Sequence, residues 1–355
     1  MIALNTPRRI WFDVLTPKQL LFFAHMMRRL KPKYEILCTS RRYGEVTSLA
    51  RLHGMNPEII GRHGGAEMSS KLRAGTERVR RLTGRVLEFA PDVAVSFCSP
   101  DAARVAFGLG IRHVAFSDTP HHGAVMRLTL PLVQKLLIPY VIPKGEFTRY
   151  GIDQDDIIQY RAIDAAITIR RKVDRSAPLP FDMGKGKNIL IRPEESHAAY
   201  VTRRGSAIPI ARRLVSEFGH DNSIVVLARY WDQARALRAE LGPHTTVTRM
   251  RYDGVHLLEN ADVFVGSGGT MTAESALMGV PTISYEAVAT TVLRRLERMR
   301  LVRVEQDPGK VASHVRRALR AGPASLARAR KFVSQMEDPA DALLVAIRRL
   351  QSREP

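Results

Sequence analysis

The chain has 355 residues, of which 45% are hydrophobic and 25% charged, a composition that excludes a disordered protein and suits a soluble globular one. Its length favours two domains, and its apolar runs are all shorter than the roughly 20 residues of a membrane span. Lys and Arg outnumber Asp and Glu by 55 to 35, so the formal charge of +20 favours a polyanionic partner such as a phosphorylated substrate or an anionic bilayer. Because the basic residues are spread along the chain without a nucleic-acid-binding motif, nucleic acid is not the expected partner.

The sequence also predicts a cytoplasmic protein. Its first ten residues lack the apolar core of a secretory signal, and its two cysteines, Cys38 and Cys98, fall in predicted buried strands, where reduced thiols are expected. A long helix predicted at residues 68–89 carries arginines, Arg78 among them, around an apolar stripe. Cationic amphipathic helices are attracted to anionic lipid, so peripheral attachment to the inner membrane face is one interpretation of this helix, and a solvated face is the other.

The first half of the chain alternates strands with helices. Strands are predicted at residues 10–15, 34–39, 58–61, 91–97, 113–116, 134–142 and 157–160. Helices are predicted at residues 17–30, 43–53, 68–89, 102–109 and 144–151, the first of them capped by Thr16. This alternation with short connections indicates a parallel sheet, and in such sheets ligands bind at the carboxyl ends of the strands.

Several polar residues follow these strands and are candidates for substrate contact: Asp13, Lys18, His63, Ser99, Asp118, His121, His122 and Arg127. Asp118 with His121 or His122 forms a candidate acid/base pair, in which the carboxylate fixes the imidazole tautomer and a ring nitrogen takes a proton from a hydroxyl. The alternative is that Asp118 caps the helix that follows and both histidines are surface residues. Asp13 is either a turn cap or a substrate contact, and Arg127 meets either phosphate or a surface acid.

A segment rich in proline and glycine at residues 172–187 is the predicted linker to the second half. Strands are then predicted at residues 188–192, 223–228, 245–249, 262–265 and 302–305, with one more before residue 286. Helices are predicted at residues 206–218, 231–241, 255–260, 270–278, 289–300, 309–321, 324–336 and 339–351, and we expect the last to pack on the first half. Arg192, at the end of the first of these strands, is a candidate sugar or phosphate contact, with solvation in a loop as the alternative.

A glycine-rich turn joins the strand at 262–265 to the helix at 270–278. Gly266, Gly268 and Gly269 permit positive φ and remove side chains that would keep a ligand from the backbone amides, while Ser267 and Thr270 add hydroxyl donors. The unpaired N–H groups and positive dipole end of the helix favour phosphate there. Glu274, about one turn into the helix, can accept hydrogen bonds from a ribose diol. The alternative is a tight turn without a ligand, capped by Thr270.

This turn carries a resemblance to known enzymes. Residues 266–276, GSGGTMTAESA, followed by Gly279-Val280-Pro281, resemble the nucleotide-sugar motif of GT-B-fold enzymes, among them the non-hydrolysing UDP-N-acetylglucosamine 2-epimerases and the MurG-type glycosyltransferases. A closer similarity is to the prokaryotic family called domain of unknown function 354. The matching pieces are Asp13, Thr16-Pro17-Lys18, Arg42-Tyr43-Gly44-Glu45, His63-Gly64-Gly65, Ser99-Pro100, Asp118-Thr119, Arg127-Leu128-Thr129-Leu130-Pro131 and the 266–276 string.

The resemblance implies two Rossmann-like halves with a nucleotide sugar between them. It also implies acidic catalytic residues after two strands of the first half, as in the epimerases. Asp118 falls at or beside the second position, but Ser99 occupies the first, with Asp101 two residues on. This departure weighs against epimerase chemistry.

We therefore expect an α/β protein of two Rossmann-like parallel-sheet domains facing across a cleft, as in the GT-B fold. Residues 1–171 are the expected acceptor or catalytic domain, 172–187 the linker, 188–338 the nucleotide-sugar-binding domain, and 339–355 a helix returning to the first domain. Expected catalytic groups are His63, Asp118, His121 and His122. The diphosphate and ribose are expected at Gly266, Ser267, Gly268, Gly269, Thr270 and Glu274, with further contacts from Asp13, Lys18, Ser99, Arg127 and Arg192.

The expected function is transfer of a sugar from a diphosphate donor, with UDP as the expected nucleotide, to a hydroxyl acceptor. A lipid-linked or phosphorylated acceptor is the kind that a basic surface attracts. A 2-epimerase-like isomerase and a non-catalytic nucleotide-sugar-binding protein are the alternatives. No metal or cofactor is expected, because a helix N-terminus with a nearby arginine can offset the charge of the leaving diphosphate.

Overall fold

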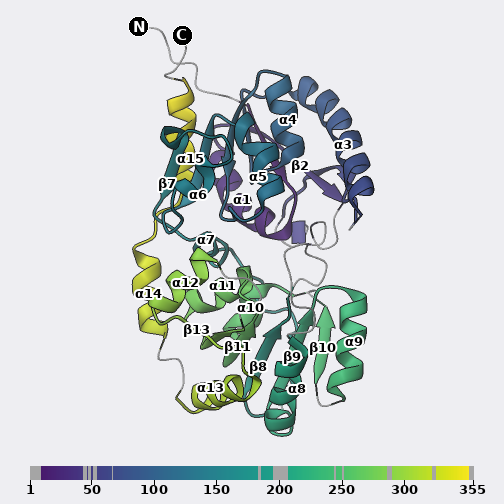
Figure 1. Ribbon diagram of the computed structural model, residues 1–355, viewed down its shortest axis with the longest axis vertical. Coiled ribbons are helices and arrows are strands. Elements are labelled where there is room, and N and C mark those ends of the chain that lie inside the picture. Colours follow the sequence, from purple (N-terminus) through teal and green to yellow (C-terminus); the bar gives the residue numbers. More distant parts are fainter. Residues whose placement is uncertain are drawn as a thin grey trace. The chain divides into compact units, whose positions relative to one another are not determined.

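The structure, a computed structural model, describes residues 9–42, 46, 49–50, 54–65, 67–182, 185–194, 207–243, 245–249, 252–285, 290–321 and 325–351. The chain forms two compact units (Figure 1). The N-terminal unit comprises Met1–Thr168 and Met336–Pro355, and the C-terminal unit comprises Ile169–Gln335. The predicted helix at 43–53 and the matching piece Tyr43-Gly44-Glu45 lie largely outside the described residues.

The N-terminal unit is built on a seven-stranded parallel sheet of order β3-β2-β1-β4-β5-β6-β7. Its strands are β1 (Arg9–Val14), β2 (Glu35–Arg42), β3 (Glu58–Arg62), β4 (Val93–Ser96), β5 (Arg112–Phe116), β6 (Lys135–Pro139) and β7 (Ile157–Tyr160). The strand order reverses between β1 and β4, where Asp13 lies level with Ser96. Such a reversal is the usual place for a ligand in an open parallel sheet.

Helices accompany this sheet (Figure 1). They are α1 (Pro17–Leu30), α3 (Met68–Phe89), α4 (Pro100–Gly108), α5 (Gly123–Thr129), α6 (Gly145–Thr148), α7 (Ala165–Thr168) and α15 (Pro339–Gln351), with short 3-10 turns at Leu130–Leu132 and Gln154–Asp156. Thr16 caps α1, as its side chain accepts a hydrogen bond from the Gln19 amide at 3.4 Å. Phe22 and Phe23 of α1 then pack edge-on against Phe116 of β5, with ring centroids 5.3 and 5.6 Å apart.

The C-terminal helix α15 belongs to the N-terminal unit, where it contacts β5, β6, β7 and α1. Two side chains of α1 hold the segment that leads into it: His25 lies 2.7 Å and Arg29 2.8 Å from the carboxylate of Asp338. Together these contacts keep the pKa of Asp338 at about 2, although its partial burial by itself raises it. The two ends of the chain therefore build one unit.

The C-terminal unit repeats the architecture with a six-stranded parallel sheet of order β10-β9-β8-β11-β12-β13. Its strands are β8 (Asn188–Arg192), β9 (Ser223–Ala228), β10 (Thr246–Arg249), β11 (Val263–Gly266), β12 (Thr282–Ser284) and β13 (Val302–Val304). Its helices are α8 (Ala207–Phe218), α9 (Trp231–Leu241), α10 (Gly254–Glu259), α11 (Thr270–Met278), α12 (Thr291–Arg298), α13 (Pro308–Ala321) and α14 (Leu326–Ser334). The strand order here reverses between β8 and β11.

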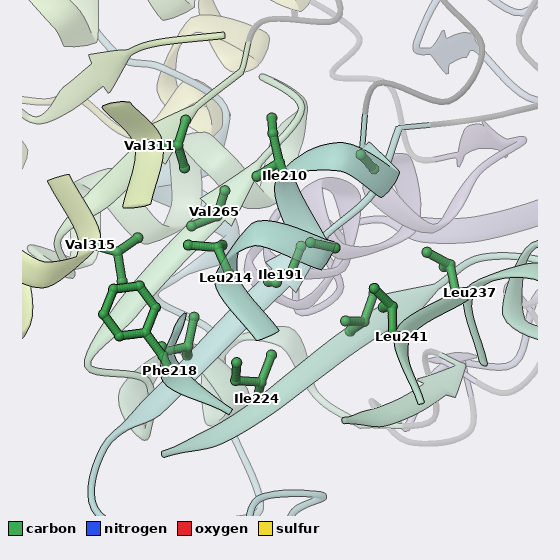
Figure 2. Close-up of a cluster of buried hydrophobic side chains, with 14 of the residues drawn as sticks. Ile191, Ile210, Leu214, Phe218, Ile224, Leu237, Leu241, Val265, Val311 and Val315 are labelled. Atoms are coloured by element: carbon green, nitrogen blue, oxygen red, sulfur yellow. The ribbon is translucent and has the colours of Figure 1, made fainter. Parts of the chain in front are cut away.

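Apolar side chains at helical spacing close the core of this unit (Figure 2). Ile210, Leu214 and Phe218 of α8 lie one turn apart and pack on Ile191 of β8, while Val311 of α13 belongs to the same buried cluster. Strands β9 and β11 are buried along their length, as is typical of the inner strands of a parallel sheet covered on both faces. The predicted α/β class with two Rossmann-like parallel sheets is confirmed. No helix within the described ranges combines the length and hydropathy needed to cross a bilayer.

In the N-terminal unit, charged side chains of the protein itself occupy the place where the strand order reverses. Arg78 of α3 is only 1% exposed, which corrects the expectation that the arginines of this helix lie on a solvated face. Its guanidinium contacts both oxygens of buried Asp13, at 2.6 and 3.1 Å, and also reaches Asp101 at 3.0 Å. Thr39 and Ser99 donate to the same Asp13 carboxylate at 2.6 and 2.7 Å. Burial by itself raises the pKa of Asp13, but these partners outweigh it and keep the pKa below its ordinary value.

We predict that Arg78→Met destabilises the N-terminal unit by about 3–5 kcal/mol, because it leaves the Asp13 carboxylate buried without its cation. Denaturant unfolding followed by Trp11 fluorescence measures this. Trp11 is a suitable reporter since its indole N–H bonds to Thr39 at 2.8 Å within the same network, and Trp231→Phe removes the other tryptophan of the chain.

The matched control is Arg80→Met on the same helix. Arg80 is exposed and pairs with Glu77 one turn away, so its replacement should change the free energy of unfolding by no more than about 0.5 kcal/mol. An equal effect of the two substitutions would contradict the account of Arg78.

Candidate functional site

Two carboxylates and one lysine meet beside the aromatic core of the N-terminal unit. Lys18, in the first turn of α1, forms ion pairs with Asp118, which follows β5, and with Asp164, which precedes α7, the latter at 3.0 Å. The Lys18 ammonium also lies 4.5 Å from the centre of the Phe97 ring. Burial by itself lowers the pKa of Lys18, but the two carboxylates outweigh it and raise the pKa above its ordinary value.

The two carboxylate oxygens of Asp118 differ in their contacts. Its Oδ2 takes the contact with Lys18, whereas Oδ1 is buried without a hydrogen-bond partner among the described residues. It does not cap α5, because the N-cap of that helix is His122, so the alternative of a helix-capping Asp118 does not apply. Buried oxygens without a partner are rare in native proteins, and they call for a ligand, a water molecule or a proton.

His121 and His122 follow Asp118 in the loop before α5. Their rings meet edge to face with centroids 4.6 Å apart. Partial burial lowers the pKa of both imidazoles, His121 adds to the fall at His122, and the Asp118 carboxylate opposes it in both. The three side chains therefore influence one another electrostatically, and both histidines favour the neutral form that can accept a proton.

Other candidates of the N-terminal unit have partners within the protein. Asp13 and Ser99 belong to the Arg78 network, and Ser99 also caps α4 by accepting from the Ala102 amide at 3.2 Å. His63 is partly buried after β3, where its Nδ1 accepts a hydrogen bond from the Gly65 amide at 3.1 Å. Arg127 is exposed on α5, with its guanidinium 5.9 Å from the centre of the Tyr150 ring. These contacts do not join His63 or Arg127 to Asp118.

The glycine turn of the C-terminal unit lies at the strand-order reversal of that sheet, directly after β11. Gly268 has a φ of +98°, and Gly269 is the N-cap of α11 in extended conformation. The Gly268 amide donates to the Thr272 hydroxyl at 3.2 Å. No described residue accepts a hydrogen bond from the amides of Gly269, Thr270 or Met271, and Gly269 is exposed. These N–H groups stand at the positive end of the helix dipole.

Gly266 shows why this strand must end in glycine. A Cβ atom there would lie 2.5 Å from the Phe264 ring and 2.7 Å from the Thr272 hydroxyl. The close approach lets the chain turn directly from β11 into the loop. A Cβ atom on Gly269, by contrast, would meet nothing within 4 Å, so the space above that amide is open.

Glu274 lies buried one turn into α11, in a cluster of charges. Arg171 is 3.8 Å from its carboxylate and makes a two-pronged contact with Asp253 at 2.6 and 3.0 Å. Asp253 in turn caps α10 by accepting from the Val255 amide at 2.8 Å. Asp253 thus takes the close contacts of the Arg171 guanidinium, and the contact between Arg171 and Glu274 is the longer one.

Arg192 and its neighbours form the other side of this strand-order reversal. The Arg192 guanidinium donates to the Leu227 carbonyl at 2.8 Å, at the end of β9. Tyr285, which follows β12, donates to Glu194 at 2.7 Å and also bonds to Ser267 of the glycine turn. The turn is thereby tied to the segment after β8.

Asp164, Tyr160 and Arg171 were not predicted from the sequence. Asp164 was the most detectable, because it is a lone acid in the apolar stretch Ala162–Ile167 directly after a predicted strand, and such a position argues for a buried partner. Arg171 carries no local signal, since it lies among other basic residues at the unit boundary. Within the described residues, no group of three or more His, Cys, Asp or Glu side chains is arranged to hold a metal ion.

Solved structures share this fold along the whole chain. UDP-GlcNAc 2-epimerase from Neisseria meningitidis, bound to UDP-GlcNAc, has a TM-score of 0.74 at 14% identity, covering 97% of this chain and 100% of that one. The Methanocaldococcus jannaschii UDP-GlcNAc 2-epimerase in complex with UDP-GlcNAc and UDP has a TM-score of 0.66 at 13% identity, covering 96% and 99%. A spinosyn forosaminyltransferase has a TM-score of 0.60 at 15% identity, covering 98% and 100%. At these identities the similarity establishes the GT-B-like fold.

A relative in sequence is an uncharacterised protein of Methanocaldococcus jannaschii. It is 27% identical over 284 residues, which cover 78% of this chain and 81% of that protein. Residues 8–348 match the family described as Protein of unknown function (DUF354), in agreement with the resemblance that the glycine turn and its companion motifs indicate. Since this match spans nearly the whole chain, the protein belongs to the DUF354 family.

Proposed function

We propose that this protein is a glycosyltransferase that takes a sugar from a nucleotide diphosphate donor and transfers it to a hydroxyl group of an acceptor. UDP is the proposed nucleotide. The observation that carries the proposal is the set of amides at the start of α11. The N–H groups of Gly269, Thr270 and Met271 have no acceptor in the described chain, stand at a helix N-terminus, and lie at a strand-order reversal.

A diphosphate suits this turn better than a neutral ligand. Three N–H donors and the helix dipole offer partial positive charge without a mobile side chain, and the open space above Gly269 admits phosphate oxygens to the amides. The same donors stabilise the charge that grows on the diphosphate as the bond to the sugar breaks. Glu274, one turn further along the helix, is the proposed acceptor for the ribose hydroxyls.

The N-terminal unit supplies the proposed base. In the transfer, the acceptor hydroxyl gives its proton to Oδ1 of Asp118, its oxygen bonds to the anomeric carbon, and the bond from that carbon to the diphosphate breaks with its electron pair going to the diphosphate. His121 and His122, held largely neutral, are the further proposed partners of the acceptor. His63, Lys18, Arg127 and Arg192 remain proposed contacts.

An epimerase-like isomerisation is the second candidate, supported by the similarity in fold to two UDP-GlcNAc 2-epimerases. It fits the residues less well. At the strand end where the resemblance implies an acid, Ser99 is committed to Asp13 and to the cap of α4, and Asp101 contacts Arg78. Asp118 would have to act without a second free carboxylate at that position.

The first prediction separates these reactions. Incubation with UDP-sugars alone should leave the donor intact, whereas addition of a lipid and polar extract containing hydroxyl acceptors should release UDP and yield a glycosylated product, as measured by mass spectrometry. Asp118→Asn should suppress the product while leaving donor binding unchanged, because it removes the proposed base and leaves the glycine turn of the C-terminal unit unaltered. Conversion of the donor to its epimer without an acceptor would favour the second candidate, and binding without either product would contradict both.

The second prediction concerns the diphosphate. Gly269 has N-cap conformation without a side-chain cap, so both Gly269→Asn and Gly269→Asp should preserve or raise stability. The aspartate, however, places a negative charge where the diphosphate is proposed to bind. We expect the affinity for UDP, measured by calorimetry, to fall at least about tenfold more in Gly269→Asp than in Gly269→Asn.

The two replacements are nearly equal in shape, so the difference between them measures charge alone. Thermal unfolding without ligand serves as the control for folding. Equal affinities of the aspartate and asparagine variants for UDP would contradict a diphosphate at this turn.

The third prediction concerns the ribose. The unaltered protein should bind UDP more tightly than an analogue lacking the ribose hydroxyls, and Glu274→Ala should reduce that preference to near unity, because the acceptor for those hydroxyls is gone. Glu274→Gln keeps the shape and one acceptor oxygen and should retain part of the preference. If Glu274→Ala discriminates as well as the unaltered protein, the proposed contact between Glu274 and the ribose is contradicted.

A further inference from the structure

Asp164 is a buried carboxylate that the donor site does not explain. Its side chain is 3% exposed; Oδ1 accepts a hydrogen bond, whereas Oδ2 is in ion-pair contact without a hydrogen bond among the described residues. The Tyr160 hydroxyl donates to Oδ1 at 2.5 Å, and the Lys18 ammonium lies 3.0 Å from Oδ2. A fully buried acid is costly unless it is paired, so this position has a cost in stability that an apolar side chain would avoid.

Lys18 has no capacity left for a further strong partner. An ammonium group has three N–H donors, and it here meets the Asp118 carboxylate, the Asp164 carboxylate and the face of the Phe97 ring. The three partners come from the ends of β5, β7 and β4, respectively. A flexible lysine side chain is thereby fixed from three sides.

We propose, on the basis of the transferase function above, that Asp164 is a positioning residue for the base. By holding Lys18 through a second ion pair, it restricts the ammonium to Oδ2 of Asp118 and leaves Oδ1, the proposed acceptor of the hydroxyl proton, without that cation. Without Asp164 the ammonium would be free to bridge both oxygens of Asp118. The buried Oδ1 without a described partner is the feature that this arrangement explains.

The charges of the cluster make the arrangement sensitive to pH. Burial raises the pKa of Asp164 to about 6, with Asp118 adding to the rise and with Lys18 and Tyr160 opposing it. Above that pH the Lys18 ammonium pairs with two carboxylates, those of Asp118 and Asp164. Below it Asp164 is protonated, and Asp118 is the remaining carboxylate partner of Lys18 in the cluster. The titratable groups that face the cluster are Lys18 of α1, Cys98 after β4, Asp118, His121 and His122 after β5, and Tyr160 of β7.

Amine labelling tests whether Asp164 holds Lys18, and it does not require enzymatic activity. Reaction with acetic anhydride, read by peptide mass spectrometry, reports how much of each lysine is unprotonated and accessible. In Asp164→Asn the labelling of Lys18 should rise, by about tenfold for each pH unit that the pKa of its ammonium falls, because one of the two carboxylates that raise that pKa is lost.

A matched control lies in the same unit. Lys135 is also buried and pairs with Asp156 at 2.5 Å, away from the cluster. Asp156→Asn should raise the labelling of Lys135 and leave Lys18 unchanged, and Asp164→Asn should do the reverse. Unchanged labelling of Lys18 in Asp164→Asn would overturn the proposal.

The pH–rate profile of the transfer distinguishes positioning from simple support of the fold. In Asp164→Asn the pH dependence of kcat/KM should lose the step near pH 6 that follows the ionisation of Asp164, since the side chain at this position no longer titrates. In Tyr160→Phe that step should move to higher pH, because the lost hydrogen bond favours protonated Asp164. A uniform loss of rate at every pH, with the step unchanged, would overturn the proposal. If no donor is turned over, the proposed function fails, and the labelling still decides whether Asp164 holds Lys18.

Discussion

The reversal of strand order in each sheet is the constraint around which this molecule is built. In each sheet the chain begins with a central strand, adds strands on one side and then adds strands on the other. The connections that leave the carboxyl ends of the two central strands therefore run in opposite directions. Polar backbone at that point needs partners. In the N-terminal unit the side chains of Arg78 and Asp13 occupy that point and pair with each other, whereas in the C-terminal unit the amides after β11 have no acceptor among the described residues. Two similar sheets thus have different capacities for a ligand.

The difference follows from what each strand carries at its end. Near its carboxyl end β1 carries a charged side chain, Asp13. Its carboxylate is neutralised by Arg78, which lies 65 residues later in the sequence. β11 ends in Gly266, and a Cβ atom on Gly269 at the start of α11 would meet nothing within 4 Å. An arginine buried against carboxylates is a weak contributor to net stability but a strong one to uniqueness of structure, provided that both partners are present. The N-terminal unit is therefore preorganised by charge, and its site lies to one side of the reversal, around Lys18.

Much of the fold could be predicted from the sequence because local patterns determine it. The helices at Met68–Phe89 and Thr270–Met278 begin and end where the apolar spacing and the glycines predict. The burial of Arg78 could not be predicted, because an arginine on an amphipathic helix looks solvated until its partners on β1 and α4 are known. The same holds for Asp164 and Arg171: their roles depend on residues that the chain brings close only through tertiary packing. The glycine turn could be located from the sequence. The hydrogen bonds and ion pair by which Asp13 and Ser99 join the buried Arg78 network could not be predicted.

The return of α15 to the N-terminal unit has a consequence for how the protein is made. The amide of Glu337 donates to the Arg161 carbonyl at 3.0 Å, its side chain accepts from the Arg161 amide at 2.9 Å, and Asp338 is held by α1. Most multidomain chains complete their first domain while the ribosome is still translating the next. Here the N-terminal sheet is synthesised first, but its helix α15 is translated only after the whole of the C-terminal unit. The portion translated second is thus the first that can finish folding during synthesis.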